Sequence, residues 1–363
     1  MHICLDISDH GYGHLAQIAP VADRLRIHMP NMKLTIRSRI PAKIISRFVT
    51  GPIQFEPAAS EAKVHMAGPS EMLVKETASE FKNLHKNWHD IISHEANVLN
   101  ALSPDILVTD ITYSSLAAAH QVGLPAVGVS SLNWADIYQA YCGVYEESQS
   151  IIEQIFAAYN SADAFLQLTP HLPMPHITNR TSIGPSARLS PTSLGVVRQR
   201  ARLTNYTRVV LVGFGGIQGT GRPSSLPELA NTVWVSEQSA SEGRNDVYSL
   251  KDLDLQFYEA VPDADLVVTK PGYGTIVEAA CQGARVLLQE RPDWPETEIM
   301  MAWLEEHGCF APISGLAMAT GNIGAKVDAL LQRHVPTPFP QPSGADEAAK
   351  IIAGFSKNAS LLN

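Results

Sequence analysis

Short apolar runs alternate with longer segments of helical periodicity along most of the sequence, and this alternation restricts the chain to few folds. The apolar runs include HICLDIS (2–8), DILVTD (105–110), RVVLVG (208–213) and DLVVTK (265–270). Runs with so few polar residues are typical of strands that helices cover on both faces. Strands that alternate with helices predict parallel sheets with crossover connections. The expected fold class is α/β, with two doubly wound Rossmann-like domains that face a cleft.

A proline-rich stretch divides the 363 residues into two parts. It holds Pro170, Pro173, Pro175, Pro185 and Pro191 and few periodic segments, as a linker does. A chain of this length is also longer than one hydrophobic core usually supports. The predicted division is a first domain over 1–169, a linker over 170–206, a second domain over 207–340 and a terminal helix within 341–363 that packs back on the first domain. We also expect one long amphipathic helix over 77–102.

Composition excludes several classes of partner. The formal net charge is −9 and no long Lys/Arg run occurs, which argues against nucleic acid as the main partner. No apolar stretch reaches the ~18 residues of a membrane span, and no signal peptide is recognisable, so we expect a cytoplasmic protein without an integral membrane segment. The 4 cysteines are widely spaced, which indicates reduced core thiols rather than a metal site or disulfides. The sequence leaves the oligomeric state open.

The stretch DHGYGHLAQ (9–17) places a glycine turn between the first expected strand and helix. Gly11, Gly13 and Ala16 match a loose dinucleotide fingerprint. The acidic ribose ligand expected ~20 residues further on is missing, but Arg37 and Arg39 end the second strand, where they could take a 2′-phosphate. An NADP-dependent oxidoreductase is therefore one alternative.

A second turn, KPGYGTIVEAACQG (270–283), joins a buried strand to a helix. The N–H groups of a helix start at Tyr273, Gly274 and Thr275 suit a diphosphate, and Lys270 adds a positive charge. Glu278 has two interpretations: it accepts hydrogen bonds from ribose hydroxyls, or it closes the helix start as the partner of Thr275 in a capping box.

A third turn, GFGG (213–216), follows the first strand of the second domain. Gly215 and Gly216 allow the backbone to approach an anion. We therefore expect them to contribute to the same diphosphate site.

These turns carry a family resemblance. The second turn resembles the nucleotide-sugar signature of UDP-dependent glycosyltransferases of the GT-B fold, on which Lys270, Gly272, Thr275, Glu278 and Gly283 fall, the first and third as substitutions. GYGH (11–14) and ILVTDITYSS (106–115) look like the segments that supply a general base and its aspartate in those enzymes. HGYGH, SSLNWADIY, GFGG and KPGYGTIVEA together resemble more closely the glycosyltransferase-like N-terminal domain of L-arabinokinases and its stand-alone bacterial relatives.

The resemblance implies an activity and its residues. The implied reaction transfers a sugar, with inversion and without a metal, from a nucleoside diphosphate sugar, UDP-linked by the family's pattern, to a small-molecule acceptor. His14 would be the general base and Asp110 would orient it; His10 is an alternative base, and Asp110 could instead cap the next helix. The nucleotide sugar is a co-substrate, so no bound cofactor is expected. The first domain would serve the acceptor and the second the donor.

Further contacts follow from the same resemblance. ERPDWPETE (290–298) would present Asp293 and Glu296 to the donor sugar, although the glutamine usual in such enzymes is missing. His10 and Tyr12 of the first turn, and Asn133 and Trp134 at the end of a strand, are candidates for substrate contact. Alternatives within the fold are a nucleotide-sugar epimerase or hydrolase and a non-catalytic nucleotide-sugar-binding protein.

Overall fold

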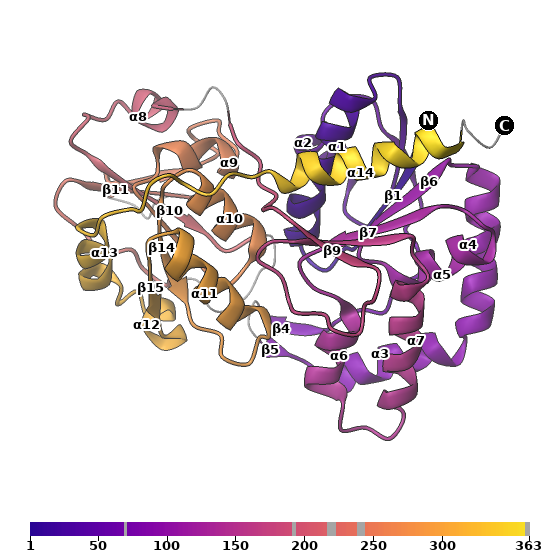
Figure 1. Ribbon diagram of the computed structural model, residues 1–363. Coiled ribbons are helices and arrows are strands. Elements are labelled where there is room, and N and C mark those ends of the chain that lie inside the picture. Colours follow the sequence, from indigo (N-terminus) through magenta and orange to yellow (C-terminus); the bar gives the residue numbers. More distant parts are fainter. Residues whose placement is uncertain (69–70, 191–193, 216–222, 238–243, 360–363) are drawn as a thin grey trace. The chain divides into compact units, whose positions relative to one another are not determined.

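The computed structural model describes the chain except for residues 69–70, 191–193, 216–222, 238–243 and 360–363. The chain forms two compact units (Figure 1). Unit 1 consists of Met1–Ala67, Glu71–Ser186 and the segment from Pro342 onward, and unit 2 consists mainly of Ala187–Gln341. The change from one unit to the other falls within 170–206, the stretch predicted as a linker, which also holds a strand and a helix.

Unit 1 is built on a seven-stranded sheet in the order β3-β2-β1-β6-β7-β8-β9, in which all neighbouring strands are parallel. Its strands are β1 (His2–Ile7), β2 (Lys33–Arg37), β3 (Gln54–Glu56), β6 (Ile106–Asp110), β7 (Ala126–Ser130), β8 (Ala164–Leu168) and β9 (Arg180–Ile183). β4 (Met66–Gly68) and β5 (Glu71–Met72) form a separate two-stranded sheet. The apolar side chains of β6 are fully buried, as their sequence predicts.

The helices of unit 1 connect these strands. They are α1 (Gly13–His28), α2 (Ala42–Phe48), α3 (Val74–Lys86), α4 (Trp88–Leu102), α5 (Tyr113–Gln121), α6 (Trp134–Cys142), α7 (Ser148–Asn160) and α14 (Gly344–Ala359). The prediction of one helix over 77–102 is wrong, because the helix is interrupted at Asn87. That residue ends α3 and begins α4 with φ −106° and ψ 20°, and its N–H bonds to the carbonyl of Leu84 at 3.1 Å.

Unit 2 repeats the architecture with six parallel strands in the order β12-β11-β10-β13-β14-β15. Its strands are β10 (Arg208–Gly213), β11 (Thr232–Ser236), β12 (Val247–Ser249), β13 (Leu266–Thr269), β14 (Arg285–Gln289) and β15 (Phe310–Ile313). Its helices are α8 (Val196–Arg200), α9 (Phe257–Ala260), the 3₁₀ turn η1 (Val261–Asp263), α10 (Tyr273–Cys281), α11 (Glu296–His307), α12 (Gly315–Ala319) and α13 (Gly324–Leu331). The expected class, α/β with two doubly wound Rossmann-like sheets, is confirmed.

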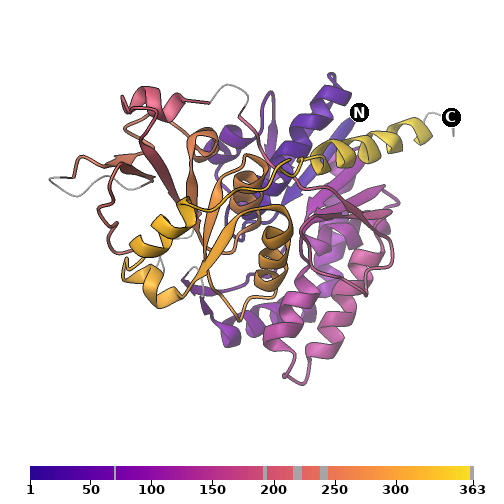
Figure 2. The same ribbon diagram turned by 60° about the vertical axis from the view of Figure 1, so that its left-hand side comes forward.

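The last helix belongs to unit 1, which the chain re-enters at Pro342 after the residues of unit 2 that end at Gln341. α14 packs against α1, as Figures 1 and 2 both show, and the His28 Nε2 and Asp346 Oδ1 atoms lie 2.8 Å apart. The N–H of Gly344 donates to the carbonyl of Pro185 at 2.9 Å. The start of α14 is therefore fixed to the segment that follows β9.

The strand order places one switch point in each unit. In unit 1 the chain builds outward from β1 through β2 to β3 and then resumes on the other side of β1 with β6. In unit 2 it does the same between β10 and β13. In sheets of this kind ligands bind outside the carboxyl ends of the strands at the switch point. These two places are therefore the candidate sites.

Candidate functional site

The switch point of unit 1 brings His14 and Asp110 together. β1 leads through a turn at Gly11, which has φ +77°, into α1, so His14 lies in the first turn of that helix. Asp110 is the last residue of β6 and pairs in register with Ile7 of β1. The His14 Nδ1 and Asp110 Oδ1 atoms are 2.9 Å apart, and both side chains are buried. Residues separated by 96 positions thus form one hydrogen-bonded pair.

Burial governs the electrostatics of this pair. Desolvation raises the pKa of Asp110, while the charge and hydrogen bond of His14 and the hydroxyl of Ser130 lower it. An ionised Asp110 fixes the imidazole proton on Nδ1, so that Nε2 presents the lone pair. The alternative that Asp110 caps the next helix is wrong, because Thr112 occupies the N-cap of α5 and no side chain caps it.

An indole ring lies against both histidines of the opening turn. The ring centroid of Trp134 is 5.4 Å from that of His10, edge-on, and 5.6 Å from that of His14. Trp134 is 1% exposed, so it packs within the site rather than offering an open platform. Tyr12 lies directly before α1 and is half-buried. The structure therefore brings His10, His14, Asp110 and Trp134 together.

Asn133 caps the start of α6. Its Oδ1 accepts from the N–H of Asp136 at 2.9 Å, and its Nδ2 donates to Asp136 Oδ2 at 2.7 Å. The side chain is fully buried and caps α6. Asn133 thus fixes the start of the helix that carries Trp134.

Sequence reasoning missed Glu61. It lies in residues 57–65, which form neither helix nor strand, and its Oε1 accepts from Trp134 Nε1 at 2.8 Å. Burial raises the pKa of Glu61 to about 7, against the opposing effects of the Trp134 hydrogen bond and the charge of His14. No periodicity or known motif surrounds this glutamate, so the sequence contains no signal that would have identified it.

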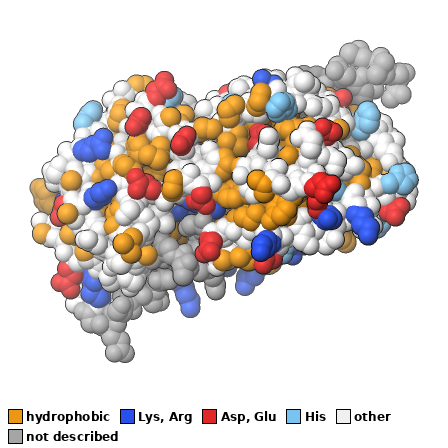
Figure 3. Space-filling view, turned by 90° about the horizontal axis from the view of Figure 1, so that it is seen from below, with side chains coloured by type: hydrophobic (Ala, Val, Ile, Leu, Met, Phe, Trp, Pro, Cys, Tyr) orange, Lys and Arg blue, Asp and Glu red, His pale blue; other side chains and the backbone are white. Residues whose placement is uncertain are grey.

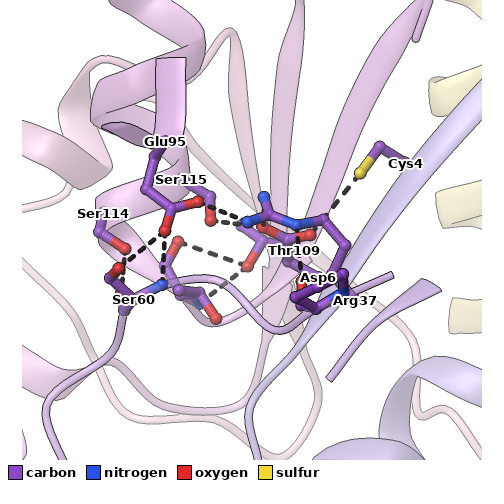
Figure 4. A network of polar contacts seen from close by, with 10 residues as sticks. Cys4, Asp6, Arg37, Ser60, Glu95, Thr109, Ser114 and Ser115 are labelled. Carbon is purple, nitrogen blue, oxygen red and sulfur yellow. Dashed lines mark hydrogen bonds and ion pairs between the residues drawn. The ribbon is translucent and has the colours of Figure 1, made fainter. Parts of the chain in front are cut away.

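Arg37 is a structural cation inside unit 1. Its side chain is 2% exposed; Nη1 is 3.1 Å from Asp6 Oδ2, and Nη2 bonds to Glu95 (Figure 4). The expectation that Arg37 could take a 2′-phosphate is therefore wrong, because two buried carboxylates already neutralise it. Arg39 is more exposed and lies 3.6 Å from Asp9. The NADP alternative loses its main support.

The switch point of unit 2 carries the start of α10. Gly272 is the N-cap, with no side-chain capping bond, and the first helical hydrogen bond runs from the N–H of Ile276 to the carbonyl of Gly272 at 3.2 Å. Thr275 is therefore in the first turn and Glu278 in the second. The capping-box alternative for these two residues is wrong. Lys270, half-buried, directly follows β13.

Glu278 already has a partner within unit 2. It is 6% exposed, and burial raises its pKa to about 7, while the charge and the backbone N–H of Arg188 lower it. The Arg188 guanidinium carbon lies 3.4 Å from the centre of the Tyr258 ring. Arg188 and Tyr258 lie outside every motif that the sequence analysis identified. In the structure Arg188 interacts with Glu278, the residue predicted to bind the ribose, and lies over the Tyr258 ring.

The predicted sugar contacts form a compact turn after β14. Trp294 Nε1 donates to Glu296 Oε2 at 3.0 Å, and the Arg291 guanidinium carbon is 4.2 Å from the Trp294 ring centre. Asp293 is exposed, whereas Glu296, the first residue of α11, is buried. Of the two carboxylates, Asp293 is the more accessible to a ligand.

Gly215 lies in the loop that follows β10, two residues after the end of the strand. It has φ +69° and is exposed, and a Cβ placed on it would meet nothing within 4 Å. The positive φ explains the glycine. Gly216 lies outside the described residues.

No group of three or more His, Cys, Asp or Glu side chains that could hold a metal ion occurs among the residues that the structure describes. Within these ranges, none of the helices is long and apolar enough to cross a membrane. Basic and acidic side chains are interspersed on the face shown in Figure 3.

Comparison with known proteins identifies the fold. No family model matches the chain. The chain is 22% identical over 323 residues to L-arabinokinase from Arabidopsis thaliana. The matched region covers 84% of this chain but only 29% of the length of L-arabinokinase. The structure of the glycosyltransferase VinC in complex with dTDP matches with a TM-score of 0.60 and 14% identity, covering 98% of this chain and 95% of VinC.

A second solved structure that matches the chain is that of an epimerase. UDP-N-acetylglucosamine 2-epimerase matches with a TM-score of 0.56 and 12% identity, covering 98% of this chain and 97% of the epimerase. The chain thus has the GT-B fold of two Rossmann-like domains. Because this fold serves both transfer and epimerisation, the fold does not select the reaction.

Proposed function

We propose that the chain is a glycosyltransferase that moves a sugar from a UDP-linked donor to a small-molecule acceptor with inversion. The observation that carries the proposal is the buried His14 Nδ1–Asp110 Oδ1 pair, 2.9 Å apart, at the switch point of unit 1. A histidine whose tautomer is fixed by a carboxylate is a suitable general base. The match to VinC, solved with dTDP, supports a nucleoside diphosphate as the donor's leaving group.

The chemistry assigned to unit 1 is proton removal. His14 Nε2 takes the proton of an acceptor hydroxyl while the hydroxyl oxygen forms a bond to the anomeric carbon of the donor. Asp110 stabilises the imidazolium that results. His10 and Tyr12, in the same turn, are proposed to contact the acceptor.

The chemistry assigned to unit 2 is stabilisation of the leaving group. As the bond from the anomeric carbon to the diphosphate breaks, its electron pair stays on the diphosphate oxygen. The first turn of α10 and the Lys270 ammonium are proposed to bind that charge, and Gly215 leaves room for it. Glu278 is proposed to accept hydrogen bonds from the ribose hydroxyls, and Asp293 and Glu296 to face the sugar. This scheme requires no metal ion.

A panel of nucleoside diphosphates and nucleotide sugars tests the donor assignment. A ligand at a hundredfold excess over its Kd stabilises the folded state by ~2.7 kcal/mol, which raises Tm. We expect UDP and UDP-sugars to raise Tm and NADPH to leave it unchanged. Stabilisation by NADPH alone would overturn the proposal.

Epimerisation is the second candidate, because UDP-N-acetylglucosamine 2-epimerase shares the fold. Incubation with UDP-N-acetylglucosamine alone separates the two reactions. An epimerase yields the 2-epimer still linked to UDP, whereas a transferase releases UDP only when an acceptor is present. Binding of the donor without any turnover in a cell extract would indicate a nucleotide-sugar-binding protein instead.

Glu278→Gln is expected to weaken UDP binding by ~1.5–3 kcal/mol, roughly 10- to 100-fold, because a charged acceptor of hydrogen bonds is lost. Because the pKa of Glu278 is about 7, the affinity of the wild type for UDP should also depend on pH. Ribose hydroxyls favour the ionised carboxylate, so wild-type affinity falls as the pH is lowered through about 7, and the variant lacks this component. Titration calorimetry between pH 5.5 and 8.5 measures both effects.

Glu298→Gln is the matched control, since Glu298 is exposed on α11 of the same unit. It should bind UDP as the wild type does. If Glu278→Gln instead lowers Tm strongly yet binds UDP normally, Glu278 serves only the fold of unit 2 through Arg188.

A further inference from the structure

An irregular segment of unit 1 holds a carboxylate beside the proposed base. Residues 57–65 form no regular element, yet Ala59 and Ala62 are buried on either side of Glu61. Glu61 accepts from Trp134 Nε1 at 2.8 Å, and the Trp134 ring packs against His14. The hydrogen bond to Trp134 therefore holds the Glu61 side chain, and the buried alanines hold the backbone on either side of it.

A buried polar network fixes the backbone of this segment from the other side. We call it the Arg37 cluster; it consists of Asp6, Arg37, Ser60, Glu95, Ser114 and Ser115 (Figure 4). Glu95 Oε1 accepts from the N–H of Ser60 at 2.8 Å and from its hydroxyl at 2.7 Å. Ser114 Oγ donates to the carbonyl of Ser60. All three polar groups of Ser60, the residue before Glu61, are thus held.

The groups that face Glu61 come from several elements. His14 of α1, Asp9 of the opening turn, Tyr113 of α5 and Tyr159 of α7 interact with its charge. Ser8 and Trp134 bond to it. Of these groups His14 alone can carry a positive charge, whereas Asp9 opposes ionisation of Glu61. Burial raises the pKa of Glu61 to about 7, so the group titrates in the range where imidazoles do.

We propose that Glu61 is a second anionic partner of His14, placed by Trp134 and the Arg37 cluster, and that it stabilises the imidazolium together with Asp110. Asp110 orients the ring through Nδ1, and Glu61 adds a charge from a separate segment of the chain. Glu61 is a positioning residue in this role, since it acts through His14. Its effect on turnover rests on the proposed function; its effect on the imidazole does not.

NMR titration of the protein without any substrate tests the proposal. The side-chain carboxyl carbon of Glu61, assigned by its loss in Glu61→Gln, should titrate with a midpoint near 7, far above the ~4.3 of a free glutamate. In Glu61→Gln the midpoint of the His14 ring-proton titration should move to lower pH by at least about half a unit, because a nearby anion favours the protonated ring. Glu76→Gln, an exposed glutamate of α3, should leave that midpoint unchanged.

An unchanged His14 midpoint in a folded Glu61→Gln protein would overturn the proposal. If Glu61→Gln does not fold, Trp134→Phe, which keeps a ring beside His14 but removes the bond that places Glu61, takes its place, and an unchanged His14 midpoint in that variant would overturn the proposal equally. In a transfer assay Glu61→Gln should lower kcat several-fold, most strongly at the alkaline end of the pH profile, where Glu61 is ionised in the wild type, with KM for the donor unchanged. Failure of the proposed function would leave the two NMR results standing, so the two failures are distinguishable.

Discussion

His14→Ala is expected to lower kcat by about 10²- to 10⁴-fold while donor affinity stays near its wild-type value. The imidazole would accept the acceptor proton mainly in the transition state, so its loss acts on kcat rather than on donor binding. The buried contact with Asp110 supports this role. Steady-state kinetics with the donor found in the panel, together with calorimetric binding of UDP, measure the two quantities separately.

His10→Ala is the matched control, because His10 lies against the same Trp134 ring, whereas the contact with Asp110 is made by His14. It should cost far less activity. Asp110→Asn should lower kcat in the wild-type background and add little in His14→Ala, since residues that act as a unit are not additive. Normal turnover in His14→Ala with no activity in His10→Ala would transfer the role of base to His10.

Arg37→Met is expected to lower the free energy of unfolding by ~3–5 kcal/mol, because it leaves Asp6 and Glu95 buried without a cation. Burial already raises the pKa of Asp6, and Arg37 opposes that shift. Without Arg37 the Asp6 carboxyl holds its proton to higher pH, and stability falls as the pH rises through the pKa of Asp6. The loss should therefore be greater at pH 8 than at pH 5, which urea unfolding at the two pH values measures.

Arg39→Met is the control for the loss of a charge, since Arg39 is 42% exposed on its side chain and its pair with Asp9 spans 3.6 Å. Exposed pairs of this kind contribute about 0–1 kcal/mol. A similarly small effect of Arg37→Met would contradict the structural role of the Arg37 cluster. Adding Asp6→Asn and Glu95→Gln to Arg37→Met should recover part of the loss, because the unpaired charges are then gone.

The sequence was informative wherever a strand leads into a glycine turn. Continuous apolar runs were enough to predict parallel sheets, and the glycine turns predicted after residues 2–8 and 265–270 lie at the switch points that the strand order of the structure defines. The pairing of His14 with Asp110 was predicted from family resemblance, and the structure places the two in contact. The roles of these residues stay predictions.

The sequence was uninformative where a residue's environment comes from a distant segment. Glu61 and Arg188 lie outside regular elements, and their neighbours Trp134 and Glu278 are 73 and 90 positions away. Arg37 looked available for a phosphate because its two carboxylate partners come from β1 and α4. The break at Asn87 was missed because apolar spacing continues through it, so periodicity alone cannot reveal where one helix ends and the next begins.

The place of α14 has a consequence for the order in which the molecule is made. Translation proceeds from the amino end, so all of Ala187–Gln341 leaves the ribosome before the helix that completes unit 1. Until then the surface of α1 that α14 covers, and the carbonyl of Pro185 that receives the N–H of Gly344, stay open to solvent or to other partners in the cell. Of the two units, unit 1 therefore begins first and is completed last, and the strands between Ala187 and Gln341 can form their sheet before α14 is available to pack against α1.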